Sequence, residues 1–260
     1  MPFVVVNDQK LYYTDTGGDG PVILFSHGLF MNQAMFAPQI AALRDTHRCI
    51  AWDERGHGQT GPATAPFSYY DSAADAVGLL HALGIEQAVF AGMSQGGFLS
   101  LRAALRHPQA VRALVLLDTQ AGTETPEDLA AHARQVDLWR RHGLYQRMAD
   151  GMEQHILGKG FTDAEHWKTQ WGQFDIDNVA QLFRTLDDRD DLTPRLNDIK
   201  APALVVHGEA DSAIPMVRAE ALAAGLNAEL VCIPGAGHAA NLTHPDAVNP
   251  AIRRFLDALD

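Results

Sequence analysis

The segment from Ala88 to Gly97 contains the residues whose types and spacing point most clearly to chemistry. An apolar run is followed by Gly92, Ser94 and Gly96, and then by a helical pattern. A serine at a sharp turn between a strand and a helix takes a strained backbone conformation, which lifts its hydroxyl above the edge of the sheet. The residues two positions before and after it must be very small, because they lie against neighbouring backbone. The pattern therefore predicts that Ser94 is a nucleophile.

A serine hydroxyl is a weak nucleophile until a base accepts its proton, and the base needs an acid that orients it. Asp211 lies shortly after the apolar run Leu204–Val206, and His238 follows the last such run in a loop with flanking glycines. We expect both at the carboxyl ends of parallel strands, where open α/β sheets bind their ligands. The order serine, acid, histidine is typical of this kind of turn. We therefore predict a triad of Ser94, Asp211 and His238, with Asp118 as the alternative acid.

The predicted reaction also needs two backbone N–H groups that face the oxygen on which negative charge develops. Each such donor contributes roughly 10²–10³ in rate. Gln95, directly after the serine and at the start of a predicted helix, provides one of them. The segment Ser26–Phe30 follows an earlier strand-like run, and Gly28 permits a tight turn there that presents the N–H of Leu29. We expect the amides of Leu29 and Gln95 to form the oxyanion hole.

Strand-like and helix-like patterns alternate along most of the chain. The apolar runs are of the kind found in strands that helices cover on both faces. Their alternation with helical periods predicts an α/β fold with a mostly parallel, doubly wound sheet and right-handed crossovers. The predicted strands are Phe3–Val6, Leu11–Thr14, Val22–Phe25, Cys49–Trp52, Ala88–Ala91, Leu114–Leu117, Leu204–Val206 and Leu230–Ile233.

One stretch departs from this alternation, because residues 122–197 contain helical patterns and no strand-like run. We interpret residues 122–197 as a helical cap, or lid, inserted before the next strand into an α/β core of residues 1–121 and 198–260. The lid holds three of the four tryptophans. We expect large apolar side chains to line the substrate space, namely Phe30, Met93, Trp139, Trp167 and Trp171, with Phe174 as a further candidate.

We expect a preference for uncharged esters with an apolar acyl or alcohol part, with a carboxylate-bearing enol-lactone as the alternative. An apolar lining favours esters with an apolar acyl or alcohol part, since burial of one aromatic-sized group contributes roughly 1.5–3 kcal/mol. Arg140 and Arg141 lie next to one of the lid tryptophans. If one of these arginines turns inward, it would instead pair with a carboxylate on the substrate.

Composition and charge exclude several classes of partner. Twenty basic and 32 acidic residues give a formal net charge of −12, which repels phosphate backbones and anionic lipid. We therefore expect no nucleic-acid or membrane partner, and no apolar run approaches the roughly 20 residues that span a bilayer. Met1–Asn7 lacks the basic start and apolar stretch of a signal peptide, so we expect a cytoplasmic protein. Cys49 and Cys232 are expected to be buried, and their spacing predicts no metal site.

The whole chain resembles the α/β-hydrolase fold family. The resemblance rests on His27–Gly28, Asp53–Gly58, Gly92–Gly97, His207–Asp211 and Gly235–His238. It implies a serine hydrolase without a cofactor, in which residues 53–58 brace the site and take no catalytic role. Within the superfamily the chain is similar to small carboxylesterases and to the 3-oxoadipate enol-lactonase-like group. Dehalogenases and epoxide hydrolases of this fold carry aspartate at the position of Ser94, so both chemistries are excluded.

The leading hypothesis is hydrolysis of a small carboxylic ester or lactone through an acyl-enzyme that water then releases. The same triad would also serve C–C bond hydrolysis of a diketone-like acid, or perhydrolysis without a cofactor. A small-ligand receptor with little turnover is the alternative from another class. A nucleotide-binding oxidoreductase would need Gly-x-Gly-x-x-Gly after the first parallel strand, where Ser26–Phe30 stands instead. The sequence indicates no oligomeric state.

Overall fold

The central sheet of the protein is mostly parallel, as the alternating pattern predicts. The computed structural model describes residues 3–63 and 65–259, so residues 1, 2, 64 and 260 of the predicted core lie outside the described residues. In the described part, eight strands form one sheet in the order β1-β2-β4-β3-β5-β6-β7-β8. β2 runs antiparallel to both of its neighbours, and the remaining neighbouring pairs are parallel. The strands are β1 (Phe3–Val6), β2 (Gln9–Asp15), β3 (Val22–Ser26), β4 (Arg48–Trp52), β5 (Ala88–Met93), β6 (Val111–Leu117), β7 (Ala203–Gly208) and β8 (Glu229–Ile233).

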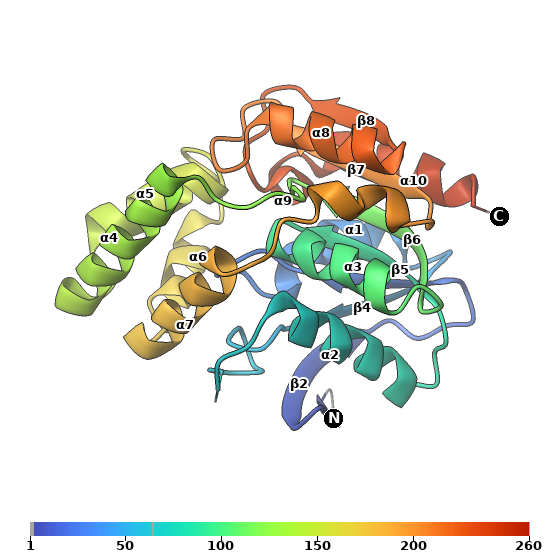
Figure 1. The fold of residues 1–260 in the computed structure, drawn as a ribbon, viewed down its shortest axis with the longest axis horizontal. Coiled ribbons are helices and arrows are strands. Elements are labelled where there is room, and N and C mark those ends of the chain that lie inside the picture. The colour runs from blue at the N-terminus through green and yellow to red at the C-terminus, as the bar shows by residue number, and fades with distance from the viewer. Residues whose placement is uncertain (1–2, 64, 260) are drawn as a thin grey trace.

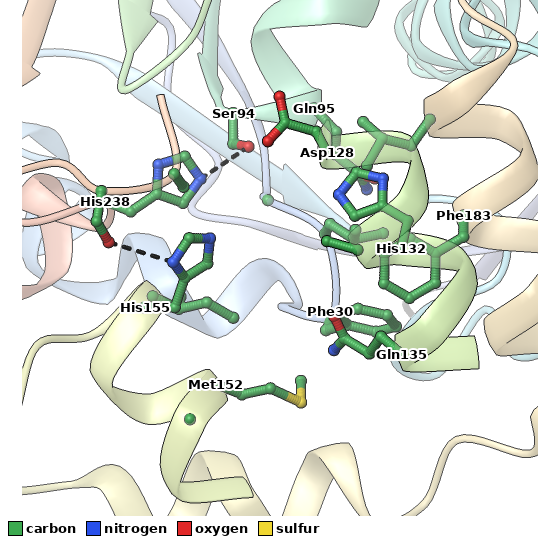
Figure 2. A pocket seen from close by; sticks show the side chains of 18 of the residues that line it. Phe30, Ser94, Gln95, Asp128, His132, Gln135, Met152, His155, Phe183 and His238 are labelled. Carbon is green, nitrogen blue, oxygen red and sulfur yellow. Dashed lines mark hydrogen bonds between the residues drawn. The ribbon is translucent and has the colours of Figure 1, made fainter. Parts of the chain in front are cut away.

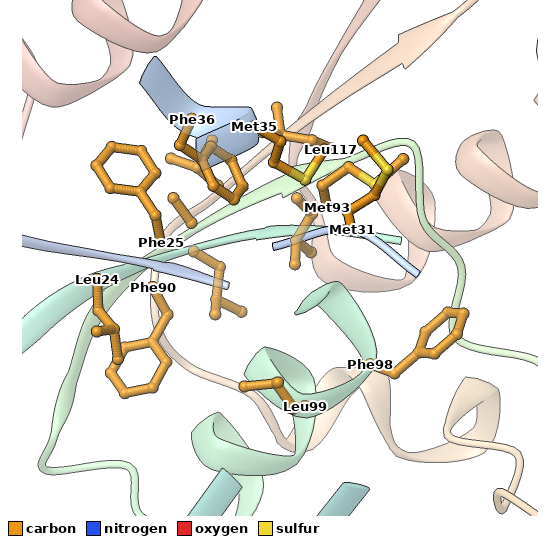
Figure 3. Packing of buried hydrophobic residues seen from close by; sticks show 14 of the residues in the cluster. Leu24, Phe25, Met31, Met35, Phe36, Phe90, Met93, Phe98, Leu99 and Leu117 are labelled. Atoms are coloured by element: carbon orange, nitrogen blue, oxygen red, sulfur yellow. The ribbon is translucent and has the colours of Figure 1, made fainter. Parts of the chain in front are cut away.

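The middle of the sheet forms the core. All six residues of β5 are buried, which explains why this strand reads as an uninterrupted apolar run. Successive side chains of β3 alternate between the two faces of the sheet. Phe25 packs against Phe36 with ring centroids 4.9 Å apart, whereas Leu24 lies with Phe90 on the opposite face (Figure 3). Because both faces carry apolar side chains, both need a layer of helices.

Two layers of helices sandwich the sheet (Figure 1). α1, α9 and α10 pack together on one face, and α2, α3 and α8 cover the other. α3 follows β5 directly, so its first turn starts at the carboxyl edge of the sheet. The bounds of these helices are α1 (Ala37–Leu43), α2 (Tyr69–Ala82), α3 (Gln95–Arg106), α8 (Met216–Leu226), α9 (Ala240–Thr243) and α10 (Pro245–Asp257), with the 3₁₀ turns η1 (Gln33–Phe36) and η2 (Thr193–Asp198).

Four helices between β6 and β7 stand to one side of the sheet (Figure 1). We call α4 (Pro126–His142), α5 (Gln146–Ile156), α6 (Ala164–Trp171) and α7 (Ile176–Asp187) the inserted helices. α4 packs against α7, and α5 packs against α6. Thr125 and Asp128 form a reciprocal cap at the start of α4, which fixes where the insertion begins. These helices fall within residues 122–197, the range for which the sequence predicts a lid.

Two further sequence expectations concern exposure. Cys49 is buried, but the prediction of a buried Cys232 is wrong, because β8 is an edge strand and Cys232 is exposed. Within the described range, no helix is long and apolar enough to cross a membrane.

Candidate active site

A chain of hydrogen bonds joins the three predicted triad residues at the carboxyl edge of the sheet. The Ser94 hydroxyl donates to Nε2 of His238 over 3.0 Å (Figure 2). Nδ1 of the same imidazole donates to Oδ2 of Asp211 over 2.8 Å. All three residues are buried, and they come from three loops that follow β5, β7 and β8. This arrangement is the one that withdraws a proton from a serine hydroxyl and stabilises the imidazolium that results.

The turn at Ser94 has the strained geometry that its glycine neighbours suggest. Ser94 has a φ of 51°, a left-handed conformation that costs about 1–3 kcal/mol in a residue with a side chain. A Cβ on Gly92 would collide with the Gly96 carbonyl, and one on Gly96 would collide with the carbonyl of Ser26. The Ser94 carbonyl accepts a hydrogen bond from the hydroxyl of Thr119 over 2.7 Å. Close packing on every side therefore holds the strained turn.

The Asp211 carboxylate is fixed by its own loop. Its Oδ1 accepts hydrogen bonds from the N–H groups of Ala213 and Ile214, at 2.8 and 2.9 Å. Burial alone would raise the pKa of Asp211, but His238 and these hydrogen bonds hold it below its usual value. Asp211 is consequently ionised at neutral pH. For His238, burial alone would lower the pKa, and the Asp211 carboxylate raises it above the usual value.

Asp118, the alternative acid, has different partners. Its Oδ1 accepts from the N–H of Gly208 at 2.8 Å, and its Oδ2 accepts from the N–H of Ala240 at 2.9 Å. It ties the end of β7 to the start of α9, and among the described residues it makes no hydrogen bond to His238. Burial and the nearby Asp211 raise the pKa of Asp118 to about 8. The geometry thus gives the role of histidine partner to Asp211.

The two amides expected to form the oxyanion hole open on the same cavity as Ser94. Leu29 and Gln95 both line this cavity. In residues 3–63 and 65–259, neither backbone N–H donates a hydrogen bond to another protein group. The loop next to Leu29 is held by His57, whose Nε2 accepts from the N–H of Phe30 over 3.2 Å. Phe30 itself has a φ of 62°, so the chain turns sharply at this point.

The cavity above Ser94 has a volume of about 790 Å³, enough for a small organic molecule. Its floor comes from the loops that carry the triad, and its roof comes mainly from α4 and α5. Phe30 and Met93, both expected from the sequence, line it. The other apolar side chains of the lining include Met31, Phe98, Leu138, Met148, Met152, Ile156, Phe183, Leu186 and Ile214.

The prediction that the lid tryptophans line this space is wrong. Trp139, Trp167 and Trp171 are buried, but the residues that line the described cavity do not include them. Trp139 stacks on the ring of Phe30 with centroids 5.7 Å apart, so it supports a lining residue from behind. Phe174 likewise contacts Phe30 edge-on, at 5.4 Å, without lining the cavity. These aromatics form the core of the inserted helices, which need an apolar interior of their own.

The arginines named from the sequence also lie away from the cavity. Arg141 pairs with Asp137 one turn earlier on the exposed face of α4, at 2.9 Å. Arg140 belongs to a shallow depression between α4 and α7. Arg134 and Arg147 line the cavity instead, and among the described residues neither forms an ion pair. The sequence analysis missed both.

Several polar lining residues were also missed. Asp128, His132 and Gln135 on α4, with His155 on α5, face the cavity in Figure 2. The available signal was the spacing of three and four residues from Asp128 through His132 to Gln135, which places them on one face of a helix. His132 also pairs with Asp187 of α7 over 2.6 Å, so it links two of the inserted helices.

Asp118, His207 and Asp211 bring possible metal ligands within 4.8 Å of one another. The oxygens of both carboxylates already accept hydrogen bonds, from the N–H groups described above and from His238. Nε2 of His207 donates to the carbonyl of Ile214 over 2.8 Å. Nδ1 of His207 has no partner among the described residues, but the four carboxylate oxygens and Nε2 of His207 are already engaged, so we assign no metal to this cluster.

Comparison with known proteins agrees with this architecture. A 2-(acetamidomethylene)succinate hydrolase of Mesorhizobium japonicum is 33% identical, over 93% of this chain and 90% of that protein. The 3-oxoadipate enol-lactonase 2 of Acinetobacter baylyi is 27% identical, over 97% of this chain and 95% of its own. The crystal structure of the enol-lactonase from Burkholderia xenovorans superposes with a TM-score of 0.90 at 28% identity, covering 98% of this chain and all of that one.

These similarities support hydrolase activity, and they confirm the resemblance to the enol-lactonase-like group. The family model described as alpha/beta hydrolase fold matches residues 21–245. The chain therefore belongs to the alpha/beta hydrolase fold family.

Proposed function

We propose that the protein hydrolyses small carboxylic esters or lactones through an acyl-enzyme on Ser94. The observation that carries the proposal is the hydrogen-bonded series Ser94, His238 and Asp211 at the floor of an open cavity. A receptor that only holds a ligand would not need an ionised carboxylate and an oriented imidazole beside a strained serine. Turnover is therefore favoured over simple binding.

In the first half-reaction, the Ser94 oxygen attacks the carbonyl carbon while Nε2 of His238 accepts its proton. The carbonyl oxygen becomes negative and receives hydrogen bonds from the amides of Leu29 and Gln95, which have no other acceptor among the described residues. The ionised Asp211 stabilises the positive imidazolium throughout. The bond between the acyl carbon and the leaving oxygen then breaks, and the leaving oxygen takes the proton from His238.

In the second half-reaction, a water molecule occupies the place that the leaving group has vacated. His238 accepts a proton from this water, and the resulting hydroxide attacks the acyl carbon. The bond between the acyl carbon and the Ser94 oxygen then breaks, and the Ser94 oxygen takes the proton back from His238. No cofactor enters either half-reaction. The inserted helices act in this proposal as a lid, because α4 and α5 supply the roof of the cavity and restrict which molecules reach Ser94.

The decisive test is covalent labelling by a fluorophosphonate probe, followed by intact mass. We expect wild type to gain one probe adduct and Ser94→Ala to gain none. Ser212→Ala is the matched control, because Ser212 is the other serine hydroxyl among the residues that line the described cavity. Hydrolysis of p-nitrophenyl acetate should fall on the order of 10⁴–10⁶ in kcat for Ser94→Ala. Labelling that persists in Ser94→Ala would overturn the assignment.

A second candidate is cleavage of a C–N bond with the same three residues. It is favoured by the similarity to the 2-(acetamidomethylene)succinate hydrolase, whose name describes an acetamido substrate. The first half-reaction would differ only in its leaving atom, a nitrogen that also needs the proton from His238. Side-by-side kcat/KM values for an acetate ester, a small lactone and a matched acetamide separate the two. An amide rate that equals or exceeds the ester rate would favour the second candidate.

A further inference from the structure

His155 of α5 approaches the catalytic centre from the side of the inserted helices. It lines the cavity, and its ring centroid lies 6.4 Å from that of His238 with 33° between the planes. Figure 2 shows the side chain directed from α5 toward the His238 ring. No hydrogen bond joins the two imidazoles among the described residues. Both rings therefore border the same part of the cavity.

Ser212 orients the His155 ring. The two side chains are hydrogen-bonded, with Nδ1 of His155 3.2 Å from the Ser212 oxygen. Within the described part of the chain, Nε2 of His155 has no partner, and it is the ring nitrogen left to face the cavity. Desolvation in the cavity wall and, to a smaller extent, the nearby His238 lower the pKa of His155, so the ring is neutral at pH 7. When the Ser212 hydroxyl donates to Nδ1, the single ring proton is on Nε2.

The position of His155 matters because of what must lie next to His238. In the function proposed above, the leaving oxygen takes its proton from Nε2 of His238, so that oxygen must come within hydrogen-bond distance of this ring. A side chain that faces the same ring across the cavity therefore lies beside the leaving group. An ether-type oxygen has a second lone pair that His238 does not use.

We propose, resting on the function proposed above, that Nε2–H of His155 donates a second hydrogen bond to the leaving-group oxygen. His155 thereby becomes a catalytic residue that favours substrates with poor leaving groups. Its proton stays on the ring: the acyl carbon–oxygen bond breaks, the oxygen keeps the electron pair, and the proton it takes comes from His238. The hydrogen bond strengthens as negative charge grows on the leaving oxygen.

The dependence on leaving group distinguishes this role from a merely structural one. An alkoxide concentrates its negative charge on oxygen, whereas p-nitrophenolate spreads the charge into its ring. Loss of a donor should therefore slow alkyl esters much more than p-nitrophenyl esters. A variant that only distorts the cavity should slow both kinds of ester equally. The ratio kcat/KM reports the steps up to leaving-group departure, so it is the quantity to compare.

The experiment measures kcat/KM for p-nitrophenyl, phenyl, trifluoroethyl and ethyl acetate. In His155→Phe we expect kcat/KM for ethyl acetate to fall about ten- to a hundredfold, and kcat/KM for p-nitrophenyl acetate to fall less than about threefold. His155→Gln, which keeps a donor of similar length, should recover part of the loss. His132→Phe is the matched control, since it removes another imidazole of the cavity wall, and it should change all four esters by the same factor.

Fluorophosphonate labelling provides a check of the triad, because fluoride is a far weaker base than an alkoxide and leaves without taking a proton. Wild-type labelling rates in His155→Phe would show that Ser94, His238 and Asp211 remain assembled. An equal loss for all four esters, or no loss for ethyl acetate, would overturn the role of His155 while the proposed function stands. If wild type neither labels nor hydrolyses any of the esters, the proposed function fails, and this inference fails with it.

Discussion

Asp118 and Asp211 place carboxylate oxygens within 4.8 Å of each other, yet of the two only Asp211 is hydrogen-bonded to the imidazole of His238. Asp211→Asn should therefore lower kcat by roughly 10⁴, because the charge that stabilises the imidazolium is lost. Asp118→Asn should lower kcat far less than Asp211→Asn, since asparagine keeps the shape and tolerates the φ of 46° at this position, although its amide can accept only one of the two backbone hydrogen bonds. The measurement is p-nitrophenyl acetate hydrolysis by both variants, after circular dichroism has shown that each is folded. If Asp118→Asn loses most of its activity while Asp211→Asn keeps a near-normal kcat, the acid of the triad is instead Asp118, at the end of β6.

The same pair predicts a dependence of stability on pH. Burial and Asp211 raise the pKa of Asp118 from 3.8 to about 8, so between these values the folded protein holds a proton that the unfolded chain has lost. The contribution of Asp118 is then fully present below about pH 4 and is lost as the pH rises through about 8. Urea unfolding from pH 5 to 8 should show wild type losing stability relative to Asp118→Asn, with a slope approaching about 1.4 kcal/mol per pH unit. If the free energy of unfolding changes with pH in the same way in both proteins, the raised pKa of Asp118 is contradicted.

The pH profile of activity should report His238. Only the neutral imidazole accepts the serine proton, and Asp211 raises the pKa of His238 above 6.5 against the effect of burial. Activity is thus lost as the pH falls through this raised pKa, and the acidic limb of kcat/KM should lie above pH 6.5. Removal of the carboxylate charge in Asp211→Asn should shift the limb to lower pH. If the acidic limb of kcat/KM stays at the same pH in Asp211→Asn, a group other than His238 controls it.

Much of the fold, and the meeting of the three predicted triad residues at one place, followed from the sequence because each depends on local patterns. A strand buried on both faces must be apolar throughout, and β5 is buried at every position. The turn at Ser94 requires glycine at 92 and 96, where a Cβ would collide with backbone. Asp211 and His238 then follow from the parallel sheet, which brings the carboxyl ends of β7 and β8 to the edge that carries Ser94.

The roof of the cavity could not be predicted in the same way. Helical periodicity shows which residues share a face, but the direction of that face depends on how the helices pack in space. Trp139 therefore looked like a ligand contact, although it stacks behind Phe30. Conversely, His155 had no signal that set it apart from the other histidines of the chain, and for His132 the spacing with Asp128 and Gln135 showed a shared helix face but not its direction. Only the packing of α4 and α5 over the sheet brings both to the cavity.

The hydrogen bond from Phe30 to His57 predicts a role for that histidine in the oxyanion hole. Nδ1 of His57 donates to the carbonyl of Arg55 over 3.1 Å, so Nε2 is the acceptor for the N–H of Phe30. Burial lowers the pKa of His57 well below its usual value, which keeps this acceptor available across the working pH range. In His57→Phe, the Phe30 N–H loses its acceptor and the adjacent Leu29 amide loses its alignment. We expect kcat to fall about ten- to a hundredfold with little change in KM.

A trifluoromethyl ketone inhibitor provides the control for His57. It forms an oxyanion on Ser94, so its affinity for His57→Phe should weaken in proportion to kcat/KM. His81→Phe, a change at an exposed position near the end of α2, should leave both quantities unchanged. Weaker turnover with undiminished inhibitor binding would show that His57 does not act through the oxyanion hole.

The charge of the preferred substrate can be predicted from the cavity wall. Arg134 and Arg147 line the cavity without an ion pair among the described residues. Of the two lining acids, Glu124 is paired with Arg189 at 2.8 Å, and Asp128 is held by its hydrogen bonds to Thr125 at the start of α4. The wall thus offers two free positive charges beside an apolar floor, in a protein whose net charge is −12. We expect a preference for esters that carry a carboxylate beyond an apolar spacer.

The measurement compares kcat/KM for the mono-p-nitrophenyl ester of adipic acid with that for p-nitrophenyl hexanoate, which has the same chain length without the charge. Wild type should prefer the charged ester about five- to thirtyfold at low salt, because an exposed arginine pair attracts a carboxylate only modestly in water. The preference should shrink in Arg134→Ala and Arg147→Ala and in 0.5 M NaCl. Arg141→Ala, whose partner is Asp137 on the far side of α4, is the matched control and should keep it. If wild type instead favours the hexanoate and neither alanine substitution changes the ratio, the apolar floor decides specificity, and the arginines serve only as surface charges.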